Sequence, residues 1–124
     1  MHDRDAAPDL QTVLDALDDA DCRDFVQALE EPMTAGELSE ACDVPRSTTY
    51  RKLDLLTDAS LVEEVTEVRA DGHHRSRYRV AFEEIRMRRD EDGELVVRIR
   101  RPEPEERGPE ERLADIWSEV RRET

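Results

Sequence analysis

The chain has 124 residues, with 33 acidic and 19 basic side chains and a formal net charge of -14. This length fits one domain with a small core. Charged residues make up 42% of the chain, but the regular apolar spacing described below argues against a disordered acidic polypeptide. We interpret the acidity as the carboxylate-rich surface of a folded protein from a salt-rich cytoplasm, where ions screen its self-repulsion.

Several functional classes lack support in the sequence. No apolar run approaches the roughly 20 residues of a membrane span, and the acidic, polar start is unlike a signal peptide. Cys22 and Cys42 have no partner at metal-ligand spacing and fall on apolar helix faces, so we interpret them as core residues. No nucleophile–base pair or phosphate-binding glycine loop is recognisable. We expect a cytoplasmic protein that is not an enzyme and holds no cofactor or metal.

Two amphipathic helices are predicted at the start of the chain. Each has apolar side chains at relative positions 0, 3, 4 and 7, which form one stripe on a helix. Asp9 can cap the first helix, Asp18, Asp19 and Asp21 are available to cap the second, and Pro32 is expected to end it. The two stripes are Leu10, Val13, Leu14 and Leu17, and Cys22, Phe25, Val26 and Leu29.

A short helix, a tight turn and a longer helix follow. Thr34 and Glu37 have the spacing of a capping box at the start of the short helix. The turn at residues 43–45 combines an aspartate, which tolerates left-handed backbone, with a proline whose φ suits a first helical turn. The short helix is expected to bury Leu38, Ala41 and Cys42. The longer helix is expected to bury Thr49, Leu53 and Leu56 and to direct outward Arg46, Ser47, Thr48, Tyr50 and Arg51.

Two β-hairpins are predicted next. Residues 61–69 are rich in Val and Thr, residues 71–72 mark a loop tip, and residues 76–82 form the returning strand. In that strand Arg77 and Arg79 alternate with apolar residues and point to the opposite face. A helix-turn-helix followed by a hairpin is a winged helix. A further hairpin over residues 85–101 alternates apolar and basic residues and turns at Asp92-Gly93.

The chain ends with a Pro/Glu linker over residues 102–108 and a helix predicted from Pro109. Acids in its first turn and arginines in its last suit the helix dipole. We therefore predict an α+β fold: a winged helix-turn-helix with an additional β-hairpin and a C-terminal dimerisation helix. Residues 1–101 would form the winged helix-turn-helix domain with its extra hairpin, and residues 102–124 the linker and C-terminal helix. The stripe of that helix is Leu113, Ile116, Trp117 and Val120.

The charge is unevenly distributed along the chain. Residues 1–44 carry a net charge of -11, residues 45–101 of +1, and residues 102–124 of -4. The bases of the middle segment cluster at the start of the longer helix and in the returning strand of the wing. DNA binding needs local positive potential rather than a basic whole chain. The residues predicted to contact double-stranded DNA are Arg46, Ser47, Thr48, Tyr50, Arg51 and Lys52 in the helix, and Arg75 and Arg77 in the wing.

Alternatives remain open for these residues. Arginine can read guanine with two hydrogen bonds, but most protein–DNA contacts go to phosphates and position the protein instead. A solvated charged face is the alternative to any DNA contact. His73 and His74, near the wing tip, either enter a narrow minor groove or are simply solvated.

Motifs between residues 21 and 82 carry a family resemblance. They are Glu37-Leu38, Arg46-Ser47-Thr48-Thr49, Leu53, Leu56, Ala59, Leu61-Val62-Glu63 and Arg77-Tyr78-Arg79. This half of the chain resembles the ArsR-type winged helix-turn-helix of prokaryotic repressors, and with its acidic bias it is most similar to small haloarchaeal regulators. The resemblance implies a homodimer with one recognition helix per subunit in the major groove and a wing on the flanking DNA.

Three departures from this family pattern matter. Asp43 and Ser60 stand where glycines are common, which predicts strained or reshaped turns. The cysteine-rich motif of the metal-sensing members is missing, so metal sensing is not implied. The hairpin at residues 85–101 exceeds a minimal winged helix and has no family role that we can assign.

We expect the first and last helices to form the dimer, because each has a narrow apolar stripe and an acidic remainder. Tryptophan is enriched at interface hot spots, although Trp117 could instead cover its own subunit's core. A dimer would place two recognition helices about 34–36 Å apart on a pseudo-palindromic site. The predicted interface residues are Leu10, Val13, Leu14, Leu17, Leu113, Ile116, Trp117 and Val120.

The leading hypothesis is a sequence-specific transcriptional regulator. In a salt-rich cell counterion release contributes little to DNA affinity, so we expect the protein to take up cations such as K⁺ on binding and to show a shallow or reversed salt dependence. The alternative is a winged helix used for protein–protein contact in a transcription or processing complex, with the acidic surface facing a basic partner. The arginines at the start of the longer helix count against that alternative.

Overall fold

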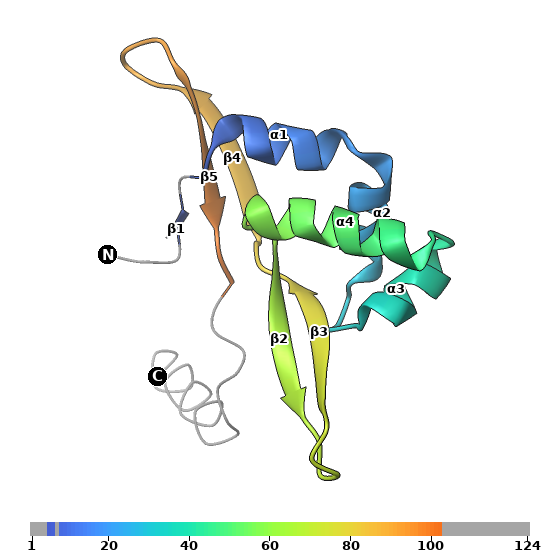
Figure 1. Ribbon diagram of the computed structural model, residues 1–124. Helices are drawn as coiled ribbons and strands as arrows, with labels where there is room; N and C mark the ends of the chain where they lie inside the picture. Colours follow the sequence, from blue (N-terminus) through green and yellow to red (C-terminus); the bar gives the residue numbers. More distant parts are fainter. Residues whose placement is uncertain (1–4, 7, 103–124) are drawn as a thin grey trace, which may run out of the picture.

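The computed structural model describes residues 5–6 and 8–102 of the chain (Figure 1). Their fold is α+β, and it has the helix-turn-helix, the wing and the additional hairpin that the sequence predicts. The C-terminal helix predicted from Pro109 lies outside the described residues. In chain order the elements are β1 (Asp5–Ala6), α1 (Leu10–Asp18), α2 (Ala20–Ala28), α3 (Ala35–Cys42), α4 (Arg46–Asp58), β2 (Val62–Val68), β3 (His74–Val80), β4 (Glu84–Arg89) and β5 (Leu95–Arg100).

Helices α1 and α2 begin at aspartate caps. The Asp9 carboxylate accepts a hydrogen bond from the Thr12 N–H at 3.1 Å, and Asp19 accepts one from the Cys22 N–H at 3.0 Å. Helix α2 ends at Ala28, before Pro32, so the expectation that this proline ends it is wrong. None of the described helices is long and apolar enough to cross a membrane.

Helices α3 and α4 form the helix-turn-helix. The Thr34–Glu37 capping box is confirmed, with both reciprocal hydrogen bonds present. Asp43 adopts the expected left-handed backbone, with φ of 58°, and Pro45 is the N-cap of α4 rather than its first helical residue. Helix α4 buries Thr49, Leu53 and Leu56, as predicted. Helix α3 buries Ala35 and Leu38, whereas Ala41 is exposed, which corrects the expectation that Ala41 is buried.

Strands β2 and β3 form the wing, an antiparallel hairpin in which Val62 pairs with Val80 and Val68 with His74. The wing is attached to the segment before α3 by two backbone hydrogen bonds between Met33 and Tyr78, of 3.0 and 2.7 Å. Phe82 lies beyond the end of β3, contrary to the predicted strand. The wing is therefore fixed to the helix-turn-helix at its base, and its tip extends away from the helices (Figure 1).

The additional hairpin, β4–β5, belongs to a second sheet of order β1-β5-β4. Val97 and Ile99 of β5 are buried in the same core as Phe25, Leu38 and the apolar face of α4. The short strand β1, which the sequence did not predict, pairs with the end of β5. In Figure 1 this hairpin extends past α1 in the direction opposite to the wing.

Candidate nucleic-acid interface

The first two turns of α4 present a cationic, polar surface. Arg46, Ser47, Tyr50 and Arg51 are exposed, because the buried face of the helix is occupied by Thr49, Leu53 and Leu56. Within the described part of the chain, neither Arg46 nor Arg51 has a carboxylate at ion-pairing distance. The two arginines are therefore available to an external anion, as the sequence predicts. Thr48 is only partly exposed.

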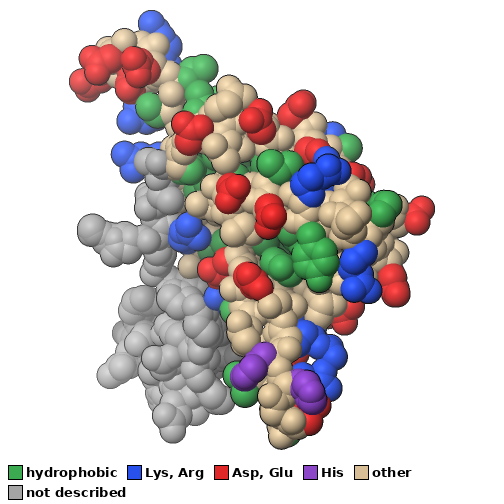
Figure 2. Space-filling model, in the orientation of Figure 1, with side chains coloured by type: hydrophobic (Ala, Val, Ile, Leu, Met, Phe, Trp, Pro, Cys, Tyr) green, Lys and Arg blue, Asp and Glu red, His purple; other side chains and the backbone are tan. Residues whose placement is uncertain are grey.

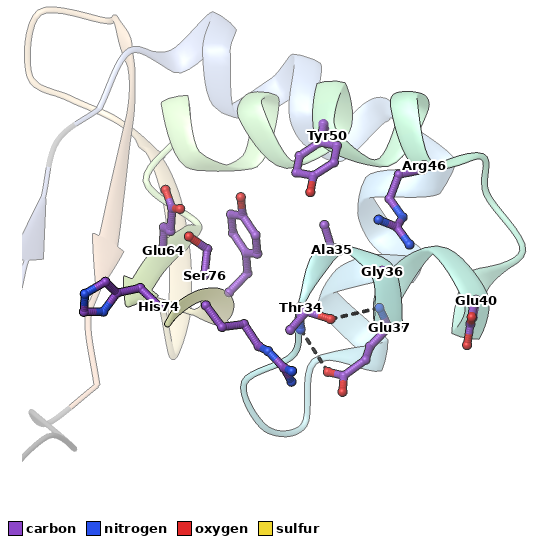
Figure 3. A pocket seen from close by; sticks show the side chains of 12 residues that line it. Thr34, Ala35, Gly36, Glu37, Glu40, Arg46, Tyr50, Glu64, His74 and Ser76 are labelled. Carbon is purple, nitrogen blue, oxygen red and sulfur yellow. Dashed lines mark hydrogen bonds between the residues drawn. The ribbon is translucent and has the colours of Figure 1, made fainter. Parts of the chain in front are cut away.

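The side chain of Arg46 extends over the start of α3. A Cβ atom added at Gly36 would lie 3.1 Å from Nη2 of Arg46. The missing side chain at Gly36 therefore leaves room for the guanidinium between the two helices, and Figure 3 shows Arg46 directed toward Gly36. This placement keeps the charge of Arg46 at the junction of α3 and α4.

The wing contributes Arg75, which is exposed and has no ion-pair partner among the described residues. Arg77 differs, because its side chain is only 25% exposed. Its Nε donates to Glu67 at 3.0 Å and its Nη1 to Glu37 at 3.3 Å. Arg77 therefore ties the wing to the capping box of α3, and its predicted contact with DNA stays a prediction.

Lys52, another predicted DNA contact, is also paired with a carboxylate, and its contact with DNA stays a prediction. Its ammonium group pairs with the Asp19 carboxylate at the start of α2, and its side chain is only 18% exposed. The hydrogen bond with Asp19 raises the pKa of Lys52. Burial alone would raise the pKa of Asp19, but hydrogen bonds from Lys52 and the Cys22 N–H outweigh it and lower that pKa. Lys52 thus fastens α4 to α2.

Cys22 is buried beside this ion pair. Burial, with the nearby Asp19 charge, raises the pKa of its thiol to about 12, and its Sγ lies 3.6 Å from the Lys52 carbonyl oxygen. Burial also raises the pKa of Cys42. Both cysteines are free thiols in the described structure, and a thiol kept protonated in this way is a poor nucleophile.

An open pocket of about 650 Å³ lies between α3, the start of α4 and the wing (Figure 3). Tyr50 enters it from α4 and Tyr78 from β3. Burial, followed by the charge of Glu64, raises the pKa of Tyr78. The residues that line the pocket are Thr34, Ala35, Gly36, Glu37, Glu40, Arg46, Tyr50, Glu64, His74, Arg75, Ser76 and Tyr78.

The pocket mixes cations with carboxylates that the sequence interpretation missed. Glu37, Glu40 and Glu64 share it with Arg46 and Arg75. The hydrogen bond from the Thr34 N–H, helped by the charge of Arg77, lowers the pKa of Glu37. Figure 2 likewise shows Asp and Glu side chains interspersed among the Lys and Arg side chains of this face. An anion that approaches the arginines therefore also approaches negative charge.

The described residues that were predicted to form the dimer interface differ in how exposed their side chains are. Val13 is fully buried in the core of its own chain, so it is not a surface contact. Leu14 is 37% exposed, and Leu10 and Leu17 are partly buried against the core. The other predicted interface residues, Leu113, Ile116, Trp117 and Val120, lie outside the described residues.

Comparison with known proteins supports the helix-turn-helix. Residues 17–65 match the family described as "Helix-turn-helix domain", and this range contains α2, α3 and α4. The match covers less than half of the chain, and it agrees with the helix-turn-helix that α3 and α4 form in the structure. No curated protein matches the chain.

One of the solved structures that match is described as "Possible transcriptional regulator from Methanosarcina mazei Go1". Its sequence identity to this chain is 17%, and the TM-score is 0.45. The match covers 60% of this chain and 73% of that one.

Proposed function

We propose that the protein is a sequence-specific, DNA-binding transcriptional regulator in which α4 is the recognition helix. One observation carries the proposal: Arg46 and Arg51 are exposed on the first turns of α4, with no carboxylate partner in the described structure, although the chain has 33 acids to 19 bases. In helix-turn-helix proteins the N-terminal residues of the second helix reach the base edges. Asp54 and Asp58 follow on the same helix, so DNA contact would be confined to its first half.

The proposed contacts divide into three kinds. Arg46 and Arg51 bind phosphates or guanine edges, since a guanidinium can do both. Ser47, Thr48 and Tyr50 add hydrogen bonds to phosphates or bases. Arg75 of the wing contacts the flanking backbone. Lys52 and Arg77, which are held by carboxylates, keep the helix and the wing in place.

We further propose that the regulator is of the ArsR type, acts as a homodimer on a pseudo-palindromic site and belongs to a salt-rich, haloarchaeal cytoplasm. The support is the sequence resemblance and the acidic surface. Because Glu37, Glu40 and Glu64 share the pocket with Arg46 and Arg75, bound phosphate would require cations beside these carboxylates. K⁺ is the cation we expect. The function is binding, and we assign the protein no enzymatic reaction.

The test begins with selection of bound duplexes from a random-sequence DNA library by the full chain. Fluorescence anisotropy then compares the wild type with an Arg46→Ala/Arg51→Ala variant on a selected duplex. A bidentate arginine–guanine pair contributes roughly 1–3 kcal/mol, so the double variant should lose at least about tenfold in affinity. The matched control is Arg86→Ala/Arg98→Ala, which removes the same charge from exposed positions of the β4–β5 hairpin.

The control variant should bind like the wild type. If Arg46→Ala/Arg51→Ala also binds like the wild type, or if selection enriches no sequence, the recognition-helix assignment is wrong. A folded double variant with unchanged DNA affinity would favour the protein–protein interaction module instead.

A further inference from the structure

Gly36 is a glycine inside a helix, at the second residue of α3. Its backbone does not require glycine, because the described glycines with positive φ are Gly72 and Gly93. Glycine destabilises a helix relative to alanine, since it loses more conformational freedom on folding. The missing side chain at residue 36 therefore needs a reason other than backbone geometry.

The reason lies in the space that Gly36 leaves for Arg46. A Cβ atom added at Gly36 would have its three nearest contacts with the Arg46 guanidinium, at 3.1 Å from Nη2, 3.3 Å from Cζ and 3.7 Å from Nε. The first two distances are shorter than ordinary van der Waals contact. The guanidinium thus lies directly against the first turn of α3 (Figure 3), where an added side chain would displace it.

Arg75 of the wing lies near the same turn of α3. Arg46 and Arg75 both line the pocket between α3, α4 and the wing. The pKa of Glu37, the residue after Gly36, is lowered mainly by the hydrogen bond from the Thr34 N–H, and the charge of Arg75 contributes to this. Among the described residues, neither arginine has an ion-pair partner. Two guanidinium groups from different elements therefore converge on one pocket.

The capping box occupies the start of α3. The Thr34 hydroxyl accepts from the Glu37 N–H, and the Glu37 carboxylate accepts from the Thr34 N–H. Arg77 holds the same carboxylate at 3.3 Å. An anion in the pocket would therefore meet a carboxylate at the end of the helix, and its attraction would come from the two arginines.

We infer that Gly36 is a positioning residue that seats Arg46 beside Arg75, where the two guanidinium groups bind a phosphate group of the DNA backbone. A guanidinium held against a helix loses less freedom on binding than one free in solvent, so this seat strengthens the contact. It also draws Arg46 away from the base edges, and a phosphate contact carries no sequence information. The inference rests on the proposed function and deepens it, because base reading is left to other residues of α4.

The first test compares DNA anisotropy and thermal unfolding of full-length Gly36→Ala and Gly36→Leu, on a selected duplex and on a scrambled one. Both residues favour helix over glycine, so the thermal midpoint should not fall. Affinity should fall, more for leucine than for alanine, toward the loss of at least about tenfold expected for Arg46→Ala. Ala41→Leu adds a leucine at an exposed position of α3 outside the pocket and should bind like the wild type.

A double-mutant cycle separates positioning from simple obstruction. In an Arg46→Ala background, Gly36→Leu should change affinity no further, because the side chain that it displaces is gone. A further loss would mean that leucine blocks the pocket itself, and it would overturn the positioning role. Arg46→Ala should weaken binding to both duplexes by the same factor, whereas a loss confined to the selected duplex would show that Arg46 reads bases.

The carboxylates of the pocket give a second, independent arm. Glu40 and Glu64 also line it, so they repel a phosphate bound there. Glu40→Gln should therefore raise DNA affinity in low KCl, where screening is weakest. Glu91→Gln makes the same change at the turn of the β4–β5 hairpin, which extends away from the wing (Figure 1), and should have no effect. An unchanged affinity for Glu40→Gln would place the phosphate outside the pocket.

Duplexes with one neutral methylphosphonate linkage at a time locate the phosphate. At one linkage the change should weaken the wild type and leave Arg46→Ala unaffected; a wild type insensitive at every linkage overturns the inference. A Gly36→Leu variant that binds the selected duplex as tightly as the wild type also overturns it but keeps the regulator. Equal, Gly36-dependent binding of every duplex keeps the phosphate site and removes the sequence-specific regulator, and a wild type that binds no duplex removes both.

Discussion

The left-handed residue at the end of α4 offers a quantitative stability test. Ser60 follows α4 with φ of 65°. Its N–H donates to the Thr57 carbonyl at 3.0 Å, and the Leu61 N–H donates to the Leu56 carbonyl at 3.0 Å. This is a Schellman cap, in which glycine is preferred at the left-handed position because it has no Cβ. We predict that Ser60→Gly stabilises the protein.

The magnitude follows from two opposing terms. A left-handed backbone costs an L-residue roughly 1–2 kcal/mol, whereas the greater unfolded-state entropy of glycine costs about 0.5–1 kcal/mol. Within the described part of the chain, the Ser60 hydroxyl makes no hydrogen bond that the change would remove. The free energy of unfolding should therefore rise by about 0.5–1 kcal/mol, which raises the thermal midpoint by roughly 2–8 °C.

Urea denaturation at constant KCl, followed by circular dichroism, measures this gain. Ser60→Ala is the matched control, because it removes the hydroxyl but keeps the Cβ, and it should not gain stability. Asp43→Gly should gain less than Ser60→Gly, since aspartate tolerates the left-handed region better than serine. If Ser60→Gly is no more stable than the wild type, the reasoning from backbone strain is refuted.

Three further predictions concern α3, its capping box and the contact residues. Thr34→Ala should lower the free energy of unfolding by about 1 kcal/mol through loss of the helix cap, while Thr34→Ser should retain it, as urea titration will measure. The pKa of Glu37 is below its ordinary value, so its charge stabilises the fold above the unfolded pKa of about 4.3, and this contribution is lost as pH falls through the folded pKa. Acid titrations should accordingly show a shallower loss of stability for Glu37→Gln, and an unchanged profile would contradict the capping-box explanation. In DNA anisotropy, Lys52→Ala should weaken binding much less than Arg51→Ala, because Lys52 is held by Asp19. Equal losses of affinity would mean that Lys52 contacts DNA as Arg51 does.

Local patterns predicted most of the helices and hairpins. The aspartate cap of α1, the capping box of α3 and the Asp92-Gly93 turn each involve residues that are neighbours in the chain, so short-range chemistry decides them. The buried face of α4 followed from its helical spacing. Ala41 was assigned to the wrong face because α3 is short, and spacing alone does not fix which side of a short helix meets the core. Strand β1 has only two residues and depends on its pairing with β5, which no local pattern reveals.

The candidate site was less predictable, because contacts between distant parts of the chain decide whether each arginine or lysine side chain is exposed or ion-paired. Arg51 and Lys52 are adjacent in sequence, yet one is exposed and the other pairs with Asp19 of a different helix. Arg75 and Arg77 differ in the same way, since Glu37 and Glu67 hold only Arg77. The alternation of β2 and β3 could have placed Glu64 on the face of Tyr78, its register partner. No such pattern in the sequence indicated that Glu40 would line the pocket.

The mixture of charges at the interface bears on how so acidic a chain could bind DNA at all. Arg46 and Arg75 share their pocket with Glu37, Glu40 and Glu64, so attraction and repulsion act on the same phosphates. Salt does not weaken the two equally: the screening length falls from about 10 Å at 0.1 M to about 3 Å at 1 M. Arginines in direct contact with phosphate keep much of their attraction, whereas carboxylates and the acidic helices behind them act over longer distances and are screened first. Affinity measured from low to molar KCl should therefore fall only slightly or rise, and a steep conventional decrease would mean that the carboxylates do not oppose binding.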